Sequence, residues 1–303
     1  MYVRDAVAAF LDGTRGEIAA STSTRYATAL GAFVAEVGEV TVEAVTAGHV
    51  RAFRSARLTK KVSPHTVNSD LRALRRLWGW LVREGLAGEN VPRAVPFVKT
   101  PREVPKAVAV EDLARLLAHL PAEPPRNRAL ILFLIDTGCR IGGAVGLTLE
   151  RLSLEQRRAI VCEKGSVSRA VFFTDYTAAA LVEWLRRRGK DPSPLVFLSA
   201  KGGGLTAGGA HQLIERVGAR AGVVGRCNPH AFRHAFARSF LTNGGNLASL
   251  AQIMGHAPGS PITAQYYAVW DGDELARMHE RYSPLSGLLS ANGNGNGLKE
   301  GRG

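Results

Sequence analysis

Apolar residues recur at helical spacing through most of the first 92 residues. The clearest segment begins at Ser63 and Pro64, a capping serine followed by proline at the first helical position. From there the apolar side chains fall on one face of a helix: Val67, Leu71, Leu74, Trp78, Leu81 and Val82. An earlier helix, capped by Ser23 or Thr24, carries Tyr26, Leu30, Phe33 and Val34 on one side. The pattern predicts an N-terminal helical bundle.

The opposite face of the helix that follows Ser63 is cationic. Its four arginines fall within roughly 100° of one another at the helical rotation per residue: Arg72, Arg75, Arg76 and Arg83. An ordinary solvated face usually mixes in acidic residues, but here only Asp70 and Glu84 lie at its margins. We therefore predict that these four arginines contact the phosphates of DNA.

A proline-rich stretch follows and interrupts the helical pattern. Pro92, Pro96, Pro101 and Pro105 come close together, and they favour an extended, basic interdomain linker over a helix. The pattern predicts a DNA-binding domain at residues 1–92, a linker at 93–106 and a second domain at 107–289. Residues 290–303, with their Asn-Gly repeats, are expected to be too polar to fold.

The second domain is predicted to mix helices with a small β-hairpin. Helices are expected at 110–120 and 125–137, and again from 177 to about 281. Two short β-rich runs lie between them, at 159–162 and 168–173, and residues 163–167 read as the hairpin turn. The predicted fold class is mainly α with a small β-hairpin or sheet, in which an α+β domain follows the helical bundle.

Charge narrows the possible partners. The 303 residues carry a formal net charge of +13, which favours a polyanionic partner, nucleic acid first and an acidic membrane surface second. The simpler alternative is a soluble protein that merely carries excess charge. Cys139, Cys162 and Cys227 are widely spaced, which argues against a disulfide framework or zinc finger. No signal peptide or membrane-spanning run is visible, so we predict a cytoplasmic protein with no membrane partner.

Several residues of the second half suit phosphoryl transfer at a DNA backbone. Arg140 and Arg233 can each present a planar fork to phosphate. His230 stands three residues before Arg233, so the two share a helix face, and Pro229 marks a helix start that favours anions. Such a site also needs a nucleophile and an acid for the leaving oxygen. Lys164, His256 and the Tyr266–Tyr267 pair supply groups of that kind.

Metal-dependent chemistry is the alternative. His230 and His234 have the spacing of a zinc-binding HExxH motif, but Ala231 stands where that motif has its glutamate. These two histidines could instead bind zinc together with His256. Two-metal nucleases need converging carboxylates, and the acidic residues 271–274 are better explained as the start of a helix. We therefore predict neither a metal nor another cofactor.

Four short motifs, in this order, resemble those of the tyrosine recombinases of the phage-integrase and Xer type. They are the segments around Arg140 (137–141) and Lys164 (163–165), the HxxRH box at 230–234, and the Met-Gly-His box at 254–256. The resemblance extends from Thr22 to Pro284. It implies a helical core-binding domain followed by a catalytic domain that cleaves and rejoins DNA through a 3′-phosphotyrosyl intermediate.

The resemblance also implies a role for each motif residue. Arg140 and Arg233 would stabilise the phosphate, with His256 hydrogen-bonding the same oxygens. Lys164 would protonate the leaving 5′ oxygen, and His230 would assist proton transfer at the tyrosine. The implied partner is double-stranded DNA with specific recombination sites, bound at two sites by a homotetramer in which residues 275–289 dock on a neighbouring subunit.

The nucleophile requires a choice between two tyrosines. Similar sequences place it nine residues after the last histidine, where this chain has Gln265. Aligning residues 263–267 with the Thr-Thr-Gln-Ile-Tyr-like segment of the family makes Tyr267 the nucleophile. The alignment requires a two-residue insertion at 258–261. Tyr266 remains the alternative.

The chain departs from the family pattern at three positions, and two other functions remain open. Gly143 replaces an acidic residue, Glu163 replaces the glycine before the lysine, and Val167 replaces a basic residue. These changes bear on the rate of reaction more than on the family. The first alternative is a tyrosine-type topoisomerase that forms the same 3′ link and relaxes supercoils as a monomer. The second is a catalytically inactive DNA-binding regulator.

Overall fold

The computed structural model describes residues 1–100, 107–162 and 168–256, together with 263–264, 272, 275–276 and 279. Backbone contacts divide the chain into two compact units, Met1–Glu103 and Val104–Gly303. The described residues are mostly helical, with one three-stranded antiparallel sheet, so the predicted fold class is confirmed. The finer domain bounds at 92, 106 and 289 stay predictions. None of the helices in the described residues has the length and apolar character to cross a membrane.

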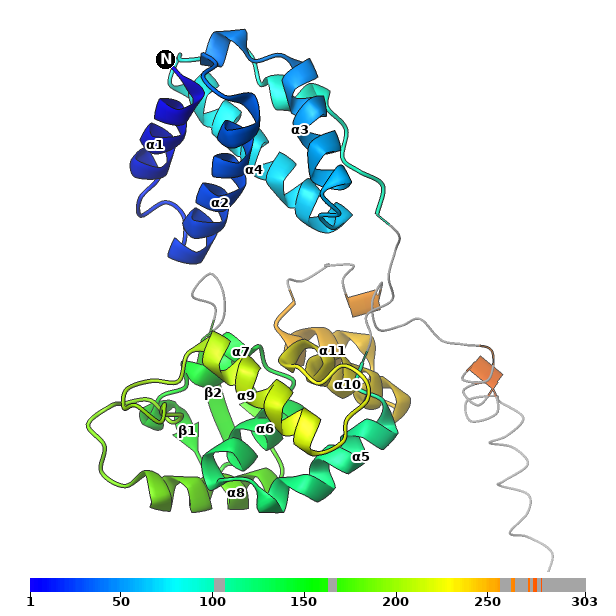
Figure 1. Cartoon of the computed structure of the whole chain (residues 1–303). Helices are drawn as coiled ribbons and strands as arrows, with labels where there is room; N and C mark the ends of the chain where they lie inside the picture. The colour runs from blue at the N-terminus through cyan, green and yellow to red at the C-terminus, as the bar shows by residue number, and fades with distance from the viewer. Residues whose placement is uncertain are drawn as a thin grey trace, which may run out of the picture. The chain divides into compact units, whose positions relative to one another are not determined.

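The first unit is a bundle of four α-helices with two 3-10 turns (Figure 1). The elements are α1 (Val3–Gly13), α2 (Ala20–Val37), η1 (Val42–Ala44), α3 (Ala47–Thr59), α4 (Pro64–Arg83) and η2 (Val91–Ala94). Three aromatic rings from α2, α3 and α4 meet edge to face at its centre. Phe33 lies 5.3 Å from Phe53 and 5.9 Å from Trp78, measured between ring centroids. The predicted helical bundle is confirmed.

Helix α4 begins where the sequence predicts. The Ser63 side chain accepts a hydrogen bond from the Thr66 backbone N–H at 3.2 Å, and Pro64 is the first helical residue. All but the last of the predicted apolar residues are buried in the core. Val82 is the exception, at 39 % exposed, because it lies at the edge of the apolar stripe, while Leu81 in the same turn is fully buried.

Helix α2 begins earlier than predicted, at Ala20 rather than after Ser23 or Thr24. The Thr24 hydroxyl donates to the Ala20 carbonyl at 3.0 Å, one turn back within the helix. A threonine can satisfy its hydroxyl in either way, as a cap or inside the helix. The prediction of a cap here was therefore wrong.

Residues 90–98 pack against α4, although the sequence predicts an extended interdomain linker from residue 93. The Arg75 guanidinium donates to the Val95 carbonyl at 2.8 Å and lies 3.9 Å from the centroid of the Phe97 ring. Asn68 exchanges two hydrogen bonds with the backbone of Val98, at 2.8 and 2.9 Å. Prolines limit this segment to the short 3-10 turn η2, and its other carbonyls remain available to the side chains of α4.

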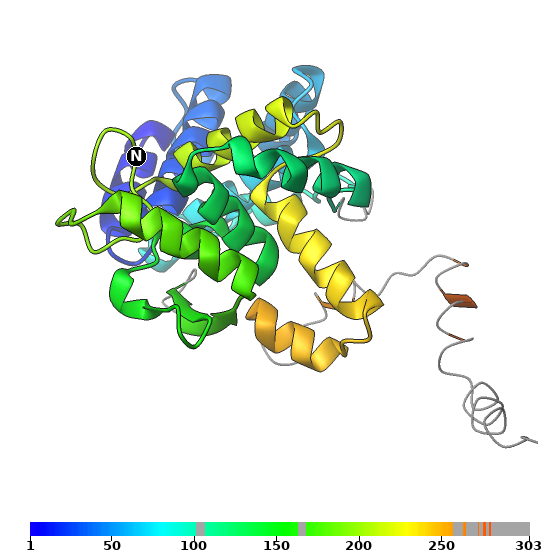
Figure 2. The same cartoon turned by 90° about the horizontal axis from the view of Figure 1, so that it is seen from below.

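The second unit is built around a buried helix, α6. Its elements are α5 (Val110–His119), η3 (Leu120–Ala122), α6 (Pro125–Thr137), α7 (Ile141–Val145), η4 (Leu149–Arg151), α8 (Asp175–Arg188), α9 (Ala207–Arg220), α10 (Pro229–Thr242) and α11 (Leu247–Met254). Residues 129–134 of α6 are all buried, as expected for a helix that is apolar on every side. Helices α8 and α10 pack against α6, and α11 packs against α10 (Figure 2). The predicted α5 and α6 are confirmed.

The sheet contains the predicted hairpin and one further strand. Strand β1 (Leu152–Ser153) pairs with β2 (Arg158–Cys162), which pairs with β3 (Ser168–Phe172), all antiparallel. A two-residue strand is too short to show an alternating pattern, so β1 has no signal in the sequence. The predicted turn at 163–167 lies outside the described residues.

Candidate active site

The end of α6 presents Arg140 to the site. Gly138 ends this helix in the left-handed region, with φ of 58°, a conformation that favours glycine. A Cβ atom there would also lie 2.6 Å from the Phe236 ring on α10. The chain can therefore turn sharply against α10, which brings the next two residues, Cys139 and Arg140, to the N-terminal end of α7.

Helix α10 supplies His230 and Arg233, and its N-terminus is firmly held. Its first residue is Pro229, as predicted, and the Asn228 side chain accepts from the Ala231 N–H at 2.9 Å. The preceding loop is anchored by Asp112 of α5, whose carboxylate accepts from the N–H groups of residues 224 and 225 at 3.2 and 2.9 Å. These two hydrogen bonds hold the pKa of Asp112 below its usual value.

Arg233 lies between the C-terminal ends of two helices. The residue is 4 % exposed, and its guanidinium donates to the Gly138 carbonyl at the end of α6, at 2.8 Å. It also donates to the carbonyl of Met254, the last residue of α11, at 2.6 Å. The C-terminal carbonyls of a helix carry partial negative charge, which stabilises a buried cation. This arrangement fixes the Arg233 fork in place.

His256 follows α11 and contacts the same guanidinium. Its Nε2 lies 3.3 Å from Nη2 of Arg233, and its Nδ1 lies 2.7 Å from the hydroxyl of Thr263. Arginine can only donate, so Nε2 is the acceptor and the ring proton of the neutral imidazole is assigned to Nδ1. The Thr263 hydroxyl then accepts a hydrogen bond from Nδ1–H and orients the ring. Thr263 opens the segment aligned with the family's tyrosine motif, but that alignment gave it no role.

A cavity of about 450 Å³ brings the predicted residues together. Arg140, His230 and Arg233 line it, with Gly143, Cys162 at the end of β2 and Ala207 at the start of α9. His256 joins this group through its contact with Arg233. Lys164, Glu163 and both tyrosines lie outside the described residues, so their positions stay predictions. The cavity thus combines two arginine forks and an imidazole, which suits the binding of a phosphate diester.

The histidines of the site have lowered pKa values. Partial burial, followed by the charges of Arg233 and Arg140, lowers the pKa of His230. Burial, with the same two charges and that of Arg169, lowers the pKa of His256 to about 4. His234, one turn after His230 on α10, also has a pKa of about 4, mainly because it is buried. All three imidazoles are therefore neutral at pH 7, when His230 can accept a proton.

Acid is expected to destabilise this unit through His234. Its pKa is about 4 when folded and roughly 6.5 when unfolded, so the unfolded chain binds the proton first as pH falls. Stability is then lost between about pH 6.5 and 4. Urea unfolding at pH 7 and 4.5 measures this loss. Between these pH values, the free energy of unfolding should fall less for His234→Gln than for the unchanged chain. An equal loss would contradict this assignment.

The predicted DNA-binding arginines line a separate groove in the first unit. Its lining residues are Tyr26, Arg72, Arg75, Arg76, Gly79, Arg83 and Arg93. Arg93 was not predicted, since it joins the group only because η2 folds back on α4. The groove gathers five arginine side chains on one surface of the bundle.

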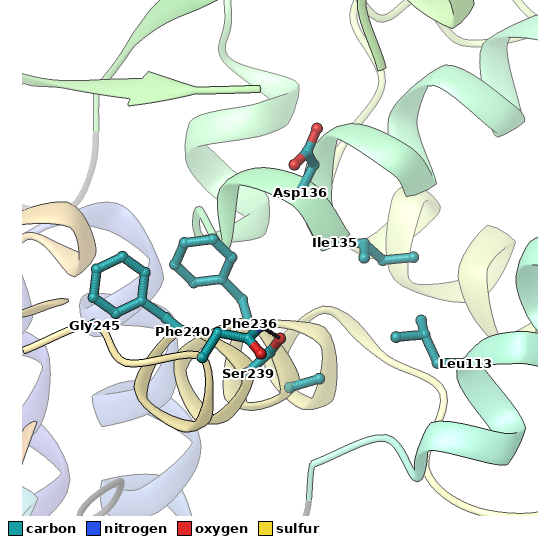
Figure 3. Close-up of a pocket in the computed structure, with 9 residues that line it drawn as sticks. Leu113, Ile135, Asp136, Phe236, Ser239, Phe240 and Gly245 are labelled. Carbon is teal, nitrogen blue, oxygen red and sulfur yellow. Dashed lines mark hydrogen bonds between the residues drawn. The ribbon is translucent and has the colours of Figure 1, made fainter. Parts of the chain in front are cut away.

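A further cavity in the second unit contains none of the predicted residues. It lies between α5, α6 and α10, and the rings of Phe236 and Phe240 form much of its wall (Figure 3). The Asp136 carboxylate at its edge accepts hydrogen bonds from Thr174 and Thr177. Among the residues that the structure describes, no three His, Cys, Asp or Glu side chains gather as metal ligands would.

Two family models match the chain. The model described as "Phage integrase family" matches residues 106–272, and that described as "Phage integrase, N-terminal SAM-like domain" matches residues 8–85. Similar proteins include tyrosine recombinase XerC of Salmonella typhi, 29 % identical over 90 % of this chain and 92 % of that protein. Tyrosine recombinase XerC of Xylella fastidiosa (strain M23) is 28 % identical over 91 % of this chain and 95 % of that protein.

Solved structures share the fold. The Tn1549 transposon integrase in complex with transposon right end DNA has a TM-score of 0.77 and 20 % identity, over 93 % of this chain and 99 % of that one. A lambda integrase tetramer bound to a Holliday junction has a TM-score of 0.72 and 14 % identity, over 91 % of this chain and 81 % of that one. At such identities the likeness concerns the fold alone.

Proposed function

Because the chain belongs to the phage integrase family, we propose that it is a site-specific recombinase that cleaves and rejoins DNA through a 3′-phosphotyrosyl intermediate. The observation that carries this proposal is the cavity in which Arg140, His230 and Arg233 converge, with His256 against Arg233. The similar proteins are named recombinases and integrases, so neither the topoisomerase nor the inactive regulator is favoured.

In the proposed reaction, the phenolic oxygen of Tyr267 attacks the scissile phosphorus and the bond to the 5′ oxygen breaks. His230 accepts the tyrosine proton, for which its lowered pKa keeps it neutral. Lys164 gives a proton to the leaving 5′ oxygen. A 5′-hydroxyl from a second DNA strand then reverses these steps, so the bond energy is kept and no ATP is required.

The arginines stabilise the charge that develops on the phosphate. Arg233 is already held by two helix ends, so its fork needs little reorganisation when DNA binds. Nε2 of His256 accepts from Arg233 in the structure. The negative charge of a bound phosphate raises the pKa of a nearby imidazole. The protonated ring of His256 then donates to a phosphate oxygen.

The first unit is proposed to bind the same duplex. Arg72, Arg76 and Arg83 would contact phosphates from the groove. Arg75 would instead hold residues 92–97 against α4, through the Val95 carbonyl and the Phe97 ring. Exchange between two recombination sites requires a homotetramer on two double-stranded DNA sites, to which residues 275–289 would contribute by docking on a neighbouring subunit. We propose that the protein acts in the cytoplasm, at the nucleoid, whether it integrates or excises a mobile element or resolves chromosome dimers.

The proposal is tested with a nicked DNA substrate that traps the covalent intermediate. The purified chain should form an adduct in EDTA at the rate seen with magnesium, because the charge is stabilised by arginines. Adduct formation that requires magnesium would contradict the metal-free mechanism. Two-site plasmids should yield recombinants. Relaxation of supercoils without recombination would instead support the topoisomerase alternative.

A further inference from the structure

Arg169 links the sheet to the end of α11. It lies on β3, opposite Val161 of β2, and its Nη1 donates to the carbonyl of Ile253 in the last turn of α11. The side chain also lies against Gly255, where a Cβ atom would come within 2.7 Å of the Arg169 Cδ and 2.9 Å of its Nε. Gly255 ends α11 in the left-handed region, with φ of 64°. Two independent contacts therefore join Arg169 to the turn that precedes His256.

Two guanidinium groups meet at this helix end. Arg233 donates to the carbonyl of Met254, and Arg169 donates to that of the residue before it. These carbonyls have no partners within the helix, and cations stabilise the negative end of its dipole. One arginine comes from α10 and the other from the sheet, so the last turn of α11 is held from two directions.

The position of Arg169 on the hairpin gives this contact a function. β2 and β3 are the strands on either side of the turn that contains Lys164. We propose that Arg169 is a positioning residue: it couples the hairpin that carries the proposed proton donor to the turn that carries His256. This inference rests on the proposed recombinase function.

Arg169→Met tests the coupling, because methionine keeps an apolar stem and removes the donors. The rate of adduct formation on the nicked substrate is expected to fall on the order of 10- to 100-fold, since small misplacements of reacting groups are that costly. DNA affinity should stay within about twofold, since the contacts of Arg169 are internal. Arg158→Met, on the exposed face of β2, is the matched control and should leave the rate unchanged.

A double-mutant cycle separates positioning from a general loss of structure. If Arg169 acts through His256, Arg169→Met should slow adduct formation by less than about twofold in a His256→Ala background. A further tenfold loss in that background would overturn the proposal. Arg169→Lys retains one cationic donor and should recover part of the rate, and it serves in place of methionine if that variant does not fold.

A readout without DNA keeps this inference distinct from the recombinase function. Arg169 contributes to the lowered pKa of His256, so nuclear magnetic resonance titration should show that pKa raised in folded Arg169→Met and unchanged in Arg158→Met. An unchanged His256 pKa in both variants would overturn the inference. A failure of the unaltered chain to form any adduct would instead overturn the proposed function and leave this titration informative.

Discussion

Replacing Arg233 with lysine is expected to slow covalent adduct formation on the order of 10³-fold. Lysine keeps the charge but presents a single ammonium group, which cannot reach both helix-end carbonyls and also offer a fork to phosphate. The loss of one such donor alone typically costs roughly 10²–10³ in rate. The substitution also removes the Arg233 donor that holds Nε2 of His256, so His256 is less well placed and the rate falls further.

Single-turnover kinetics on the nicked substrate would measure the effect, with DNA affinity determined by fluorescence anisotropy. Affinity is expected to change by less than about threefold, because most of the binding energy comes from many separate phosphate contacts. Arg187→Lys, on the exposed side of α8, is the control for the substitution itself. Thermal unfolding shows whether the variant is folded. A folded Arg233→Lys with an unchanged cleavage rate would exclude Arg233 from the proposed chemistry.

Replacing Tyr267 with phenylalanine is expected to abolish the adduct, while Tyr266→Phe leaves its rate within about fivefold. Each substitution removes only the phenolic oxygen, so the two variants compare the adjacent tyrosines directly. Denaturing electrophoresis of the trapped complex, followed by peptide mapping, identifies the linked residue. An adduct that persists in Tyr267→Phe and disappears in Tyr266→Phe would reverse the assignment and shorten the implied insertion at 258–261 from two residues to one.

The sequence predicted the elements that carry their own local signals. α4 has a capping serine, a proline and a regular apolar stripe, and α6 has an uninterrupted apolar run within a segment of helical length that begins at a proline. Elements that depend on distant contacts were missed or misplaced. Strand β1 exists through its pairing with β2, and residues 93–98 are ordered by the side chains of α4.

In the candidate site, too, the residues with local sequence signals were predicted and those that depend on distant contacts were not. Arg140, His230 and Arg233 were predicted as a group through the order of their motifs, and the structure places all three around one cavity. Asp112, Thr263 and Arg169 support this site from other elements, through hydrogen bonds that join residues far apart or in a loop. No spacing or propensity signals such contacts, because they arise only when the chain is folded.

The packing of residues 90–98 also bears on how binding responds to ionic strength. Each phosphate that a protein neutralises adds a slope of about −0.9 to the dependence of log affinity on log salt concentration. The Arg75 guanidinium is engaged by the Val95 carbonyl and the Phe97 ring. In the proposed complex, the predicted arginine face of α4 therefore contributes a slope of about −2.7 through three arginines, rather than about −3.6 through four. The fourth arginine, Arg75, instead orders residues 92–97 beside the three arginines that displace counterions from the DNA.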